Sequence, residues 1–358
     1  MSTFLHGDFE AVTEGNDEVV NLGLEELRHD DPLAPILPIM SKYDIRCSAE
    51  EFHRSVNVAF HRAESRVYDQ LHSCMWESLP EQCQLLVQDY LETGVEIGRD
   101  LVAVDIGCGT GLASDMLLNS QIGKRISRID LLDISEEMLR RAKARARSWS
   151  ATATFLHGDL ERLTHGSNRY DVTVICSVLH HIPDLAKFLP QVQTIQSPGG
   201  ILLHLQDPNG DFLHDPEQKR RIAKLAGRTR HLPSWMRRLN PRRVLDGLQR
   251  RTWGHQTDCY IDQVNKELLS AHITTKPMSA PDIWTVTDLH CSDGIGIQMN
   301  QLRRYLPDYS LISKRSYGFF GKLCSELSGT FKKAEKELIY QKATNGLYIA
   351  GIWKKQKP

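Results

Sequence analysis

The stretch LVAVDIGCGTG, residues 101–111, constrains the fold of this 358-residue chain more than any other. Its apolar start has the length and the valines of a buried strand. Asp105 follows, and then glycines occupy the alternate positions 107, 109 and 111. Glycine permits positive φ and close approach of a ligand to the backbone. Residues 112–119 then space their apolar side chains as a helix does, so the stretch predicts a nucleotide-binding corner, in which a strand turns sharply into a helix.

Strands and helices alternate after this corner. We expect strands at 126–132, 153–156, 170–177 and 201–205, helices at 135–147 and 185–195, and a turn at Pro198-Gly199-Gly200. The pattern breaks at 207–210 and returns with a helix near 296–305, a strand at 309–317, a helix at 322–342 and a strand at 347–353. Such alternation predicts an α/β protein with a doubly wound, mainly parallel sheet.

Two helices are expected before the corner. The first starts at Ser48, which forms a capping-box pattern with Glu51, and carries an apolar stripe as far as Leu71. The second is expected over 79–93, with Pro80 in its first turn. We therefore divide the chain into an N-terminal segment and helical cap (1–98), a cofactor-binding core (99–210), a substrate-lid insert (211–290) and a segment that completes the core (291–358).

Composition gives no general reason to expect a polymer or membrane partner. The formal net charge is −1, and no run approaches the roughly 18 apolar residues of a membrane span. The eight cysteines form no C-x-x-C pair, and the acidic N-terminus is unlike a signal peptide. We expect a cytoplasmic protein without a bound metal, a nucleic-acid partner or a transmembrane segment. Residues 219–251 are basic, and they fit either a lid for an anionic acceptor or a solvated surface.

Five segments of the core, taken together, resemble class I S-adenosylmethionine-dependent methyltransferases of the small-molecule type. They are VDIGCGTG (104–111), LLDISEEML (131–139), FLHGDLERL (155–163), YDVTVICSVLHHIPDL (170–185) and SPGGILL (197–203). The resemblance covers neither the first 100 residues nor the insert. It implies a Rossmann-like sheet of seven mainly parallel strands, to which this chain adds the helical cap and the helical insert.

The resemblance also implies a binding site for S-adenosyl-L-methionine at the carboxyl ends of the strands. The glycine turn and Asp105 would hold the amino-acid end of the cofactor, Asp133 the ribose hydroxyls, and Asp159 the adenine amino group. Further contacts are expected from the backbone of Leu160 and the side chain of Ile134. The full set of expected cofactor residues is Tyr68, Asp105, Gly107, Cys108, Gly109, Gly111, Asp133, Ile134, Asp159, Leu160 and Cys176.

The expected catalytic residues are His180 and His181, which follow the fourth strand. A histidine base with an aspartate four residues later is found in plant-type O-methyltransferases, and His180 and Asp184 have that spacing. Packing or positioning is the alternative role for this histidine pair. His61, Asp207 and His290 are expected on the acceptor side of the site.

The sequence therefore predicts in-line transfer of a methyl group to oxygen or nitrogen of a small acceptor, which the basic insert would allow to be anionic. A protein of this fold that binds the cofactor for another purpose is the first alternative. A nicotinamide-dependent oxidoreductase is the second, although it would not explain the GDL at 158–160. An Asn-Pro-Pro-Tyr motif of nucleic-acid methylases is absent from the sequence. The identity of the acceptor and the oligomeric state stay open.

Overall fold

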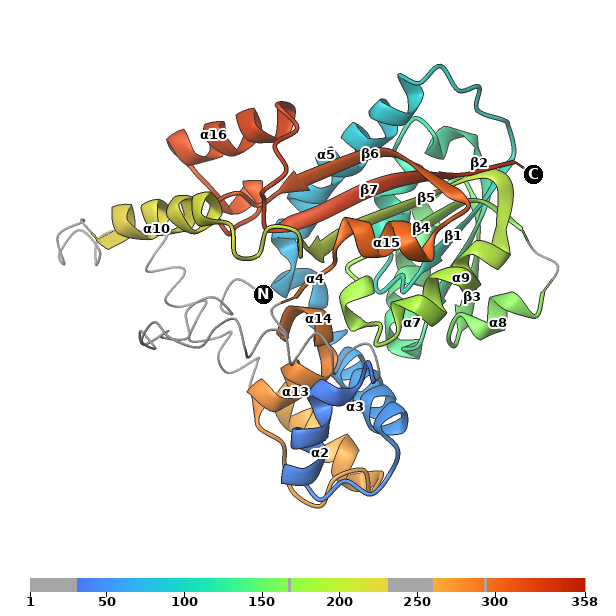
Figure 1. Ribbon diagram of the computed structural model, residues 1–358. Coiled ribbons are helices and arrows are strands. Elements are labelled where there is room, and N and C mark those ends of the chain that lie inside the picture. The colour runs from blue at the N-terminus through green and yellow to red at the C-terminus, as the bar shows by residue number, and fades with distance from the viewer. Residues whose placement is uncertain (1–30, 167–168, 231–259, 293–294, 358) are drawn as a thin grey trace.

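The computed structural model describes residues 31–166, 169–230, 260–292 and 295–357. Seven strands form one sheet in the order β3-β2-β1-β4-β5-β7-β6, in which β7 alone runs antiparallel to its neighbours (Figure 1). The strands are β1 (Leu101–Ile106), β2 (Ile126–Asp133), β3 (Thr152–His157), β4 (Tyr170–Cys176), β5 (Gln196–Pro208), β6 (Tyr309–Tyr317) and β7 (Tyr348–Lys355). The expected seven-stranded, mainly parallel, Rossmann-like sheet is confirmed. The strand order reverses between β1 and β4, which is where open sheets of this kind bind ligands.

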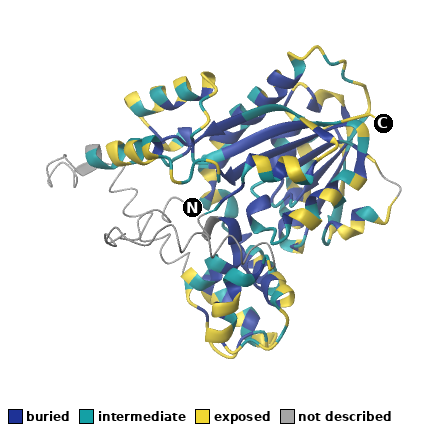
Figure 2. Ribbon diagram, in the orientation of Figure 1, coloured by how far each residue is buried: buried dark blue, intermediate teal, exposed yellow. Residues whose placement is uncertain are grey.

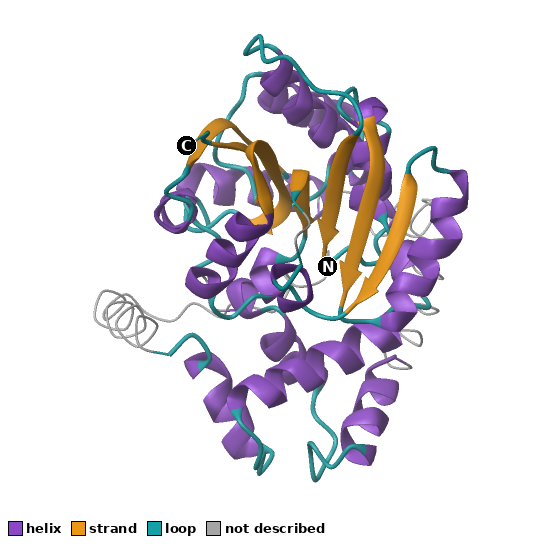
Figure 3. Cartoon of the chain, turned by 90° about the vertical axis from the view of Figure 1, so that its right-hand side faces the viewer, coloured by secondary structure: helices purple, strands orange, loops and turns teal. Residues whose placement is uncertain are grey.

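Helices cover both faces of the sheet (Figure 3). Period-two alternation along the strands divides the buried side chains between two clusters, so that Ala103 faces one side and Val104 the other. The first face is covered by α5 (Ser73–Leu91), α6 (Leu112–Leu118) and α7 (Glu136–Arg145). The second is covered by α8 (Glu161–Thr164), α9 (Leu185–Ile195) and α15 (Met299–Tyr305). Figure 2 shows the strands as the most deeply buried layer.

A separate helical lobe lies beside the carboxyl ends of the parallel strands (Figure 1). It combines η1 (Ala34–Ile36), α2 (Leu37–Lys42) and α3 (Ala49–Glu64) with α13 (Ala280–Thr287), α14 (Leu289–Ser292) and the helical residues 260–270. Phe52 and Val56 of α3 share an apolar cluster with Val264, Ile283 and Val286, all of them fully buried. The N-terminal cap and the end of the insert therefore have one common core, and we call this lobe the cover.

Four local expectations differ from the structure. The predicted helix from Ser48 to Leu71 breaks after Glu64, and a short α4 (Tyr68–Leu71) follows. Pro80 lies inside α5 rather than at its start, because a buried stripe that includes Met75 and Leu79 extends the helix toward its N-terminus. That packing offsets the roughly 3 kcal/mol that an interior proline costs a helix.

Pro198-Gly199-Gly200 also differs from expectation, since it belongs to the long strand β5 and not to a turn before it. The register between β4 and β5 shifts there, which takes up the irregular backbone. The helix expected over 322–342 is shorter, with η5 (Cys324–Glu326) followed by α16 (Gly329–Tyr340). The basic stretch 219–251 lies mostly outside the described residues; its beginning forms α10 (Pro216–Arg230).

A buried ion pair joins α5 to the edge of the sheet. Arg315 on β6 donates from Nε and an Nη to the two carboxylate oxygens of Asp89, at 2.7 Å each. Ser313 and Lys342 also contact this carboxylate, Lys342 at 2.9 Å. Burial works to raise the pKa of Asp89, but the hydrogen bonds from Arg315, Ser313 and Lys342 together outweigh it and lower the pKa below its ordinary value.

No helix in the described part of the chain combines the length and the apolar character that crossing a membrane requires.

Candidate functional site

A cavity of about 1390 Å³ lies between the carboxyl ends of the parallel strands and the cover. Eleven of the residues expected from the sequence line it: His61, Tyr68, Gly107, Cys108, Gly109, Asp133, Ile134, Asp159, Leu160, Cys176 and His181. The others, Asp105, Gly111, His180, Asp207 and His290, do not line this cavity. Residues expected to bind the cofactor and residues expected on the acceptor side thus line the same cavity, although five of the expected residues do not line it.

The glycine turn forms one end of the cavity. Gly107, Gly109 and Gly111 all have positive φ, at 68°, 53° and 90°. A Cβ on Gly109 would meet nothing within 4 Å, so this residue leaves open space for a ligand beside the backbone. A Cβ on Gly107 would come within 2.5 Å of the Val178 side chain, and one on Gly111 within 3.3 Å of Trp149. Gly111 therefore serves the packing of the turn.

These glycines offer a matched pair of substitutions. Gly109→Ala is expected to cost about 1–2 kcal/mol of folding free energy, because alanine disfavours the left-handed backbone. Gly107→Ala carries the same strain and also overlaps Val178, which should add about 1–3 kcal/mol. Chemical denaturation of both variants measures the difference. Equal losses would show that the close approach to Val178 carries no energetic weight.

Asp133 connects the glycine turn to the end of β2. Its carboxylate accepts from the backbone N–H of Gly109 and from that of Ser135, each at 2.8 Å. Each oxygen keeps a further lone pair for a ligand. Ser135 in turn caps α7 by accepting from the Met138 N–H. The carboxylate is therefore held in a fixed orientation at the cavity wall.

Asp105 has a structural position instead. It is fully buried and accepts from the backbone N–H and the hydroxyl of Ser114, at 2.9 and 2.6 Å. It therefore ties β1 to the first turn of α6 and does not line the cavity. Burial raises the pKa of Asp105 to about 7 in spite of these bonds.

Short contacts fix α4 against the glycine turn. Asp69 accepts from the Thr110 hydroxyl and from Arg145, both at 2.6 Å, and Arg145 also donates to the Thr110 carbonyl at 3.0 Å. These contacts hold Tyr68 on the cavity wall. At the adenine end of the expected site, Asp159 lies 3.4 Å from Arg54 of α3, an ion pair between half-exposed groups.

His180 is sealed behind the wall at the other end of the cavity. It is fully buried, and its Nδ1 donates to Oδ1 of Asp207 at 2.8 Å. The expected pairing of His180 with Asp184 was wrong, because Asp184 caps α9 by accepting from the Lys187 N–H at 3.0 Å. The Asp184 carboxylate is therefore used at the start of α9, and Asp207 of β5 is the carboxylate that bonds His180. His290 bonds through Nε2 to the Ile182 carbonyl oxygen at 2.9 Å.

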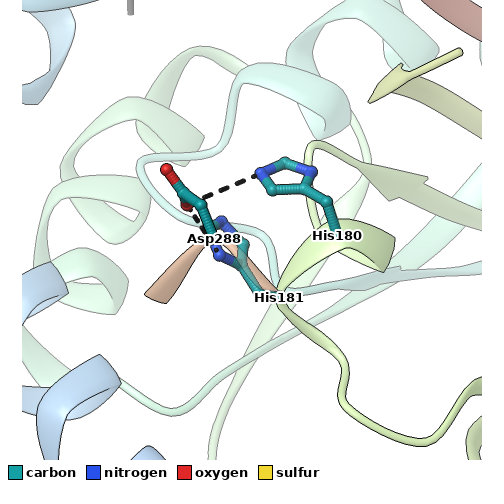
Figure 4. A group of neighbouring side chains, drawn as sticks. All are labelled: His180, His181 and Asp288. Carbon is teal, nitrogen blue, oxygen red and sulfur yellow. Dashed lines mark ion pairs between the residues drawn. The ribbon is translucent and has the colours of Figure 1, made fainter. Parts of the chain in front are cut away.

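His181 does face the cavity, and it meets a residue that the sequence analysis missed. Asp288, between α13 and α14, lines the cavity with its Oδ1 3.2 Å from Nδ1 of His181 (Figure 4). The Thr287 carbonyl oxygen accepts from the same nitrogen at 2.6 Å. The only sequence signal for Asp288 is that it lies two residues before His290.

Glu64 and His61 of α3 lie beside His181. Glu64 is buried and lies 3.0 Å from Nε2 of His72 and 3.8 Å from Nδ1 of His61, whose ring packs edge-on against His181. Burial works to raise the pKa of Glu64, but its bonds to His61 and His72 lower it to about 2. Burial works to lower the pKa of His61. The interaction with the Glu64 carboxylate outweighs the effect of burial, so the pKa of His61 lies above its usual value. Glu64 and His72, also missed from the sequence, line the cavity.

Strained backbone marks the strand ends beneath this cavity. Ser177, after β4, and Gln206, within β5, have φ of 59° and 65° although neither is glycine. Both line the cavity. Backbone strain of this kind is concentrated at functional sites, and it persists where neighbouring groups hold the backbone in place. At Gln206 the neighbouring group is the Tyr317 hydroxyl, which accepts from the backbone N–H at 2.8 Å.

Comparison with known proteins agrees with this geometry. Residues 103–200 match the family model described as a methyltransferase domain. This match covers 98 of the 358 residues of the chain. The resemblance that the sequence suggested is thereby confirmed for the core.

Curated relatives match this chain over the same region. A highly reducing polyketide synthase (azaB) of Aspergillus niger is 28% identical over 156 residues, 37% of this chain and 6% of that protein. A ubiquinone biosynthesis O-methyltransferase of Methylobacterium sp. (strain 4-46) is 31% identical over 108 residues, 30% of this chain and 41% of that protein. The aligned region thus spans less than half the length of either relative.

A comparison with solved structures also found similar chains, at low sequence identity. The plantazolicin methyltransferase BpumL, in complex with a pentazolic desmethylPZN analog and SAH, is 13% identical, with 86% of this chain and 98% of that chain covered and a TM-score of 0.44. An S-adenosylmethionine-dependent methyltransferase from Mesorhizobium loti is 16% identical, with 74% and 96% covered and a TM-score of 0.37.

Proposed function

We propose that this protein transfers a methyl group from S-adenosyl-L-methionine to an oxygen or nitrogen atom of a small acceptor enclosed under the cover. One observation carries the proposal: a single cavity joins the glycine turn and Asp133 to the histidines and Asp288. The first group has the features that a bound adenosylmethionine requires, and the second adds polar side chains to the same cavity. The volume, about 1390 Å³, is large enough for a cofactor and an acceptor together.

The residues present fit the cofactor. Gly109 leaves open space beside its backbone, and the oriented Asp133 carboxylate keeps acceptor capacity for two ribose hydroxyls. Ile134, Asp159 and Leu160 lie on the wall where the adenine would be held. When bound, the cofactor supplies an electrophilic methyl group on a sulfonium. The chain then has to hold the acceptor in line with that methyl and to offset the charge change on the acceptor atom.

The acceptor would lie between the histidine end and the aromatic side chains of the cover. Phe60, Tyr260 and Trp284 line this part of the cavity, and the Phe60 and Tyr260 rings pack edge to face. Of the two histidines predicted as the base, His181 is the one on the wall, so it is the group placed to take up a proton. His180, behind it, would act as a positioning residue together with Asp207.

Calorimetric titration with S-adenosylmethionine and separately with NADH tests the first half of this proposal. We expect binding of the sulfonium and none of NADH; tight NADH binding alone would contradict the proposal. Incubation with methyl-labelled S-adenosylmethionine and a panel of phenols, carboxylic acids and amines tests the second half. Labelled product and S-adenosylhomocysteine should appear with at least one class. Binding without turnover across the panel would favour the alternative, a cofactor-binding protein with another role.

A further inference from the structure

Three possible metal ligands converge at the histidine end of the cavity. His180 and His181 lie in η4 (Leu179–His181), just beyond β4, and Asp288 comes from the cover more than 100 residues later. Nε2 of His180 lies 4.0 Å and Nδ1 of His181 3.2 Å from Oδ1 of Asp288 (Figure 4). One ligand atom can be chosen from each residue so that all three lie within 4.8 Å of one another.

The state of His180 points to a ligand rather than to packing. Its Nδ1 faces a carboxylate oxygen of Asp207, which accepts only, so Nδ1 carries a hydrogen, and in the neutral imidazole the lone pair is on Nε2. Among the described residues this buried Nε2 has no hydrogen-bond partner. An unpaired buried polar atom costs about 1–3 kcal/mol. A carboxylate behind a histidine whose far nitrogen is open is the arrangement that orients metal-binding imidazoles.

We propose that His180, His181 and Asp288 bind a divalent transition-metal cation at the cavity wall. Two imidazoles and one carboxylate suit cations such as Zn²⁺, Fe²⁺ or Co²⁺ better than Ca²⁺ or Mg²⁺. Donor atoms about 2.1 Å from a tetrahedral ion are about 3.4 Å apart, and Nε2 of His180 and Oδ1 of Asp288 are 4.0 Å apart. Because Nδ1 of His181 donates to the Thr287 carbonyl oxygen, His181 would bind the cation through its other ring nitrogen, Nε2.

The position of the site gives the cation a function. His181 and Asp288 line the cavity, whereas His180 is buried behind them. Three protein ligands leave further coordination positions open toward the acceptor. A cation there lowers the pKa of a bound hydroxyl, which favours oxygen acceptors over amines. This role rests on the proposed function, and it makes His181 a ligand in place of a base; binding of the cation does not depend on it.

The test titrates the untagged chain, stripped with EDTA and dialysed, with Zn²⁺ by calorimetry and with Co²⁺ by visible absorption. We expect one cation per chain and the d–d bands of cobalt bound to nitrogen and oxygen. Asp288→Asn and His181→Asn should each weaken binding at least about 100-fold. Asp207→Asn, which disturbs the hydrogen bonds to the ring and the backbone N–H of His180, should weaken it about 10- to 100-fold. His165→Ala removes an exposed imidazole away from the cavity and should bind as the wild type does.

Two results would overturn the site. One is the absence of stoichiometric Zn²⁺ and Co²⁺ binding by the wild-type chain, which needs no variant. The other is unchanged affinity in both Asp288→Asn and His181→Asn. Each variant is also titrated with S-adenosylmethionine, to show that it is folded. If the wild-type chain binds the cofactor but no cation, this inference alone is overturned, whereas failure of the wild-type chain to bind the cofactor overturns the proposed function alone.

Discussion

Replacing Asp133 by asparagine is expected to weaken S-adenosylmethionine binding about 100- to 1000-fold. Hydrogen bonds to a charged acceptor contribute about 1.5–3 kcal/mol each, and the carboxylate would accept two from the ribose. A tenfold change in affinity corresponds to about 1.4 kcal/mol. Asparagine also turns an NH₂ group toward the backbone N–H of Gly109 or Ser135, so the glycine turn loses one of its two anchors.

Asp130→Asn is the matched control for this substitution. Asp130 lies three residues earlier on β2, is equally buried, and accepts from the Tyr170 hydroxyl at 2.8 Å. It does not line the cavity, so its variant should lose about 1 kcal/mol of stability and keep its affinity for the cofactor. Calorimetric titration of the two variants with S-adenosylmethionine separates a loss of cofactor affinity from a general loss of stability. If Asp133→Asn binds as tightly as the wild type, Asp133 has no place in the cofactor site.

The cofactor half of the site could be predicted because its determinants are local. The glycine turn and Asp133 each lie at the end of a strand with a clear apolar pattern, and parallel strands bring their carboxyl ends to one edge. Asp105 also lies near the end of an apolar strand, but its carboxylate accepts a hydrogen bond from Ser114 of α6 and does not face the cavity. A strand-end carboxylate that faces a helix start cannot be told from one that faces a ligand by pattern alone.

The histidine half depends on contacts that no local pattern encodes. Asp288 reaches His181 because the end of the insert packs on α3, and that packing joins residues more than 200 positions apart in the sequence. Spacing suggested Asp184 as the partner of His180, but an aspartate at a helix start satisfies backbone N–H groups first. The true partner, Asp207, comes from the neighbouring strand. Pairing across strands requires the sheet order, which the sequence gives only as an expectation.

Replacing Arg315 by methionine is expected to lower the free energy of unfolding by about 3–5 kcal/mol. The substitution leaves Asp89 buried with its charge uncompensated, apart from the half-exposed Lys342 and the Ser313 hydroxyl. Both carboxylate oxygens lose a short bond, and the Ser313 hydroxyl is left as the polar link between Asp89 of α5 and β6. Denaturant unfolding measures the loss. Arg303→Met on α15 removes an exposed arginine and should change stability by less than about 0.5 kcal/mol.

The pH dependence of the difference in unfolding free energy between the wild type and Arg315→Met shows whether the difference comes from the ion pair. Because the pKa of Asp89 is lowered in the folded state, the pair contributes stability above the unfolded pKa of about 4 and loses it as pH falls through the folded value. The gap between wild type and Arg315→Met should therefore narrow below about pH 4. The double variant Asp89→Leu/Arg315→Met, which removes both charges, should recover much of the stability at neutral pH. A gap that persists in acid, or a double variant no more stable than Arg315→Met, would assign the loss to packing of the arginine stem.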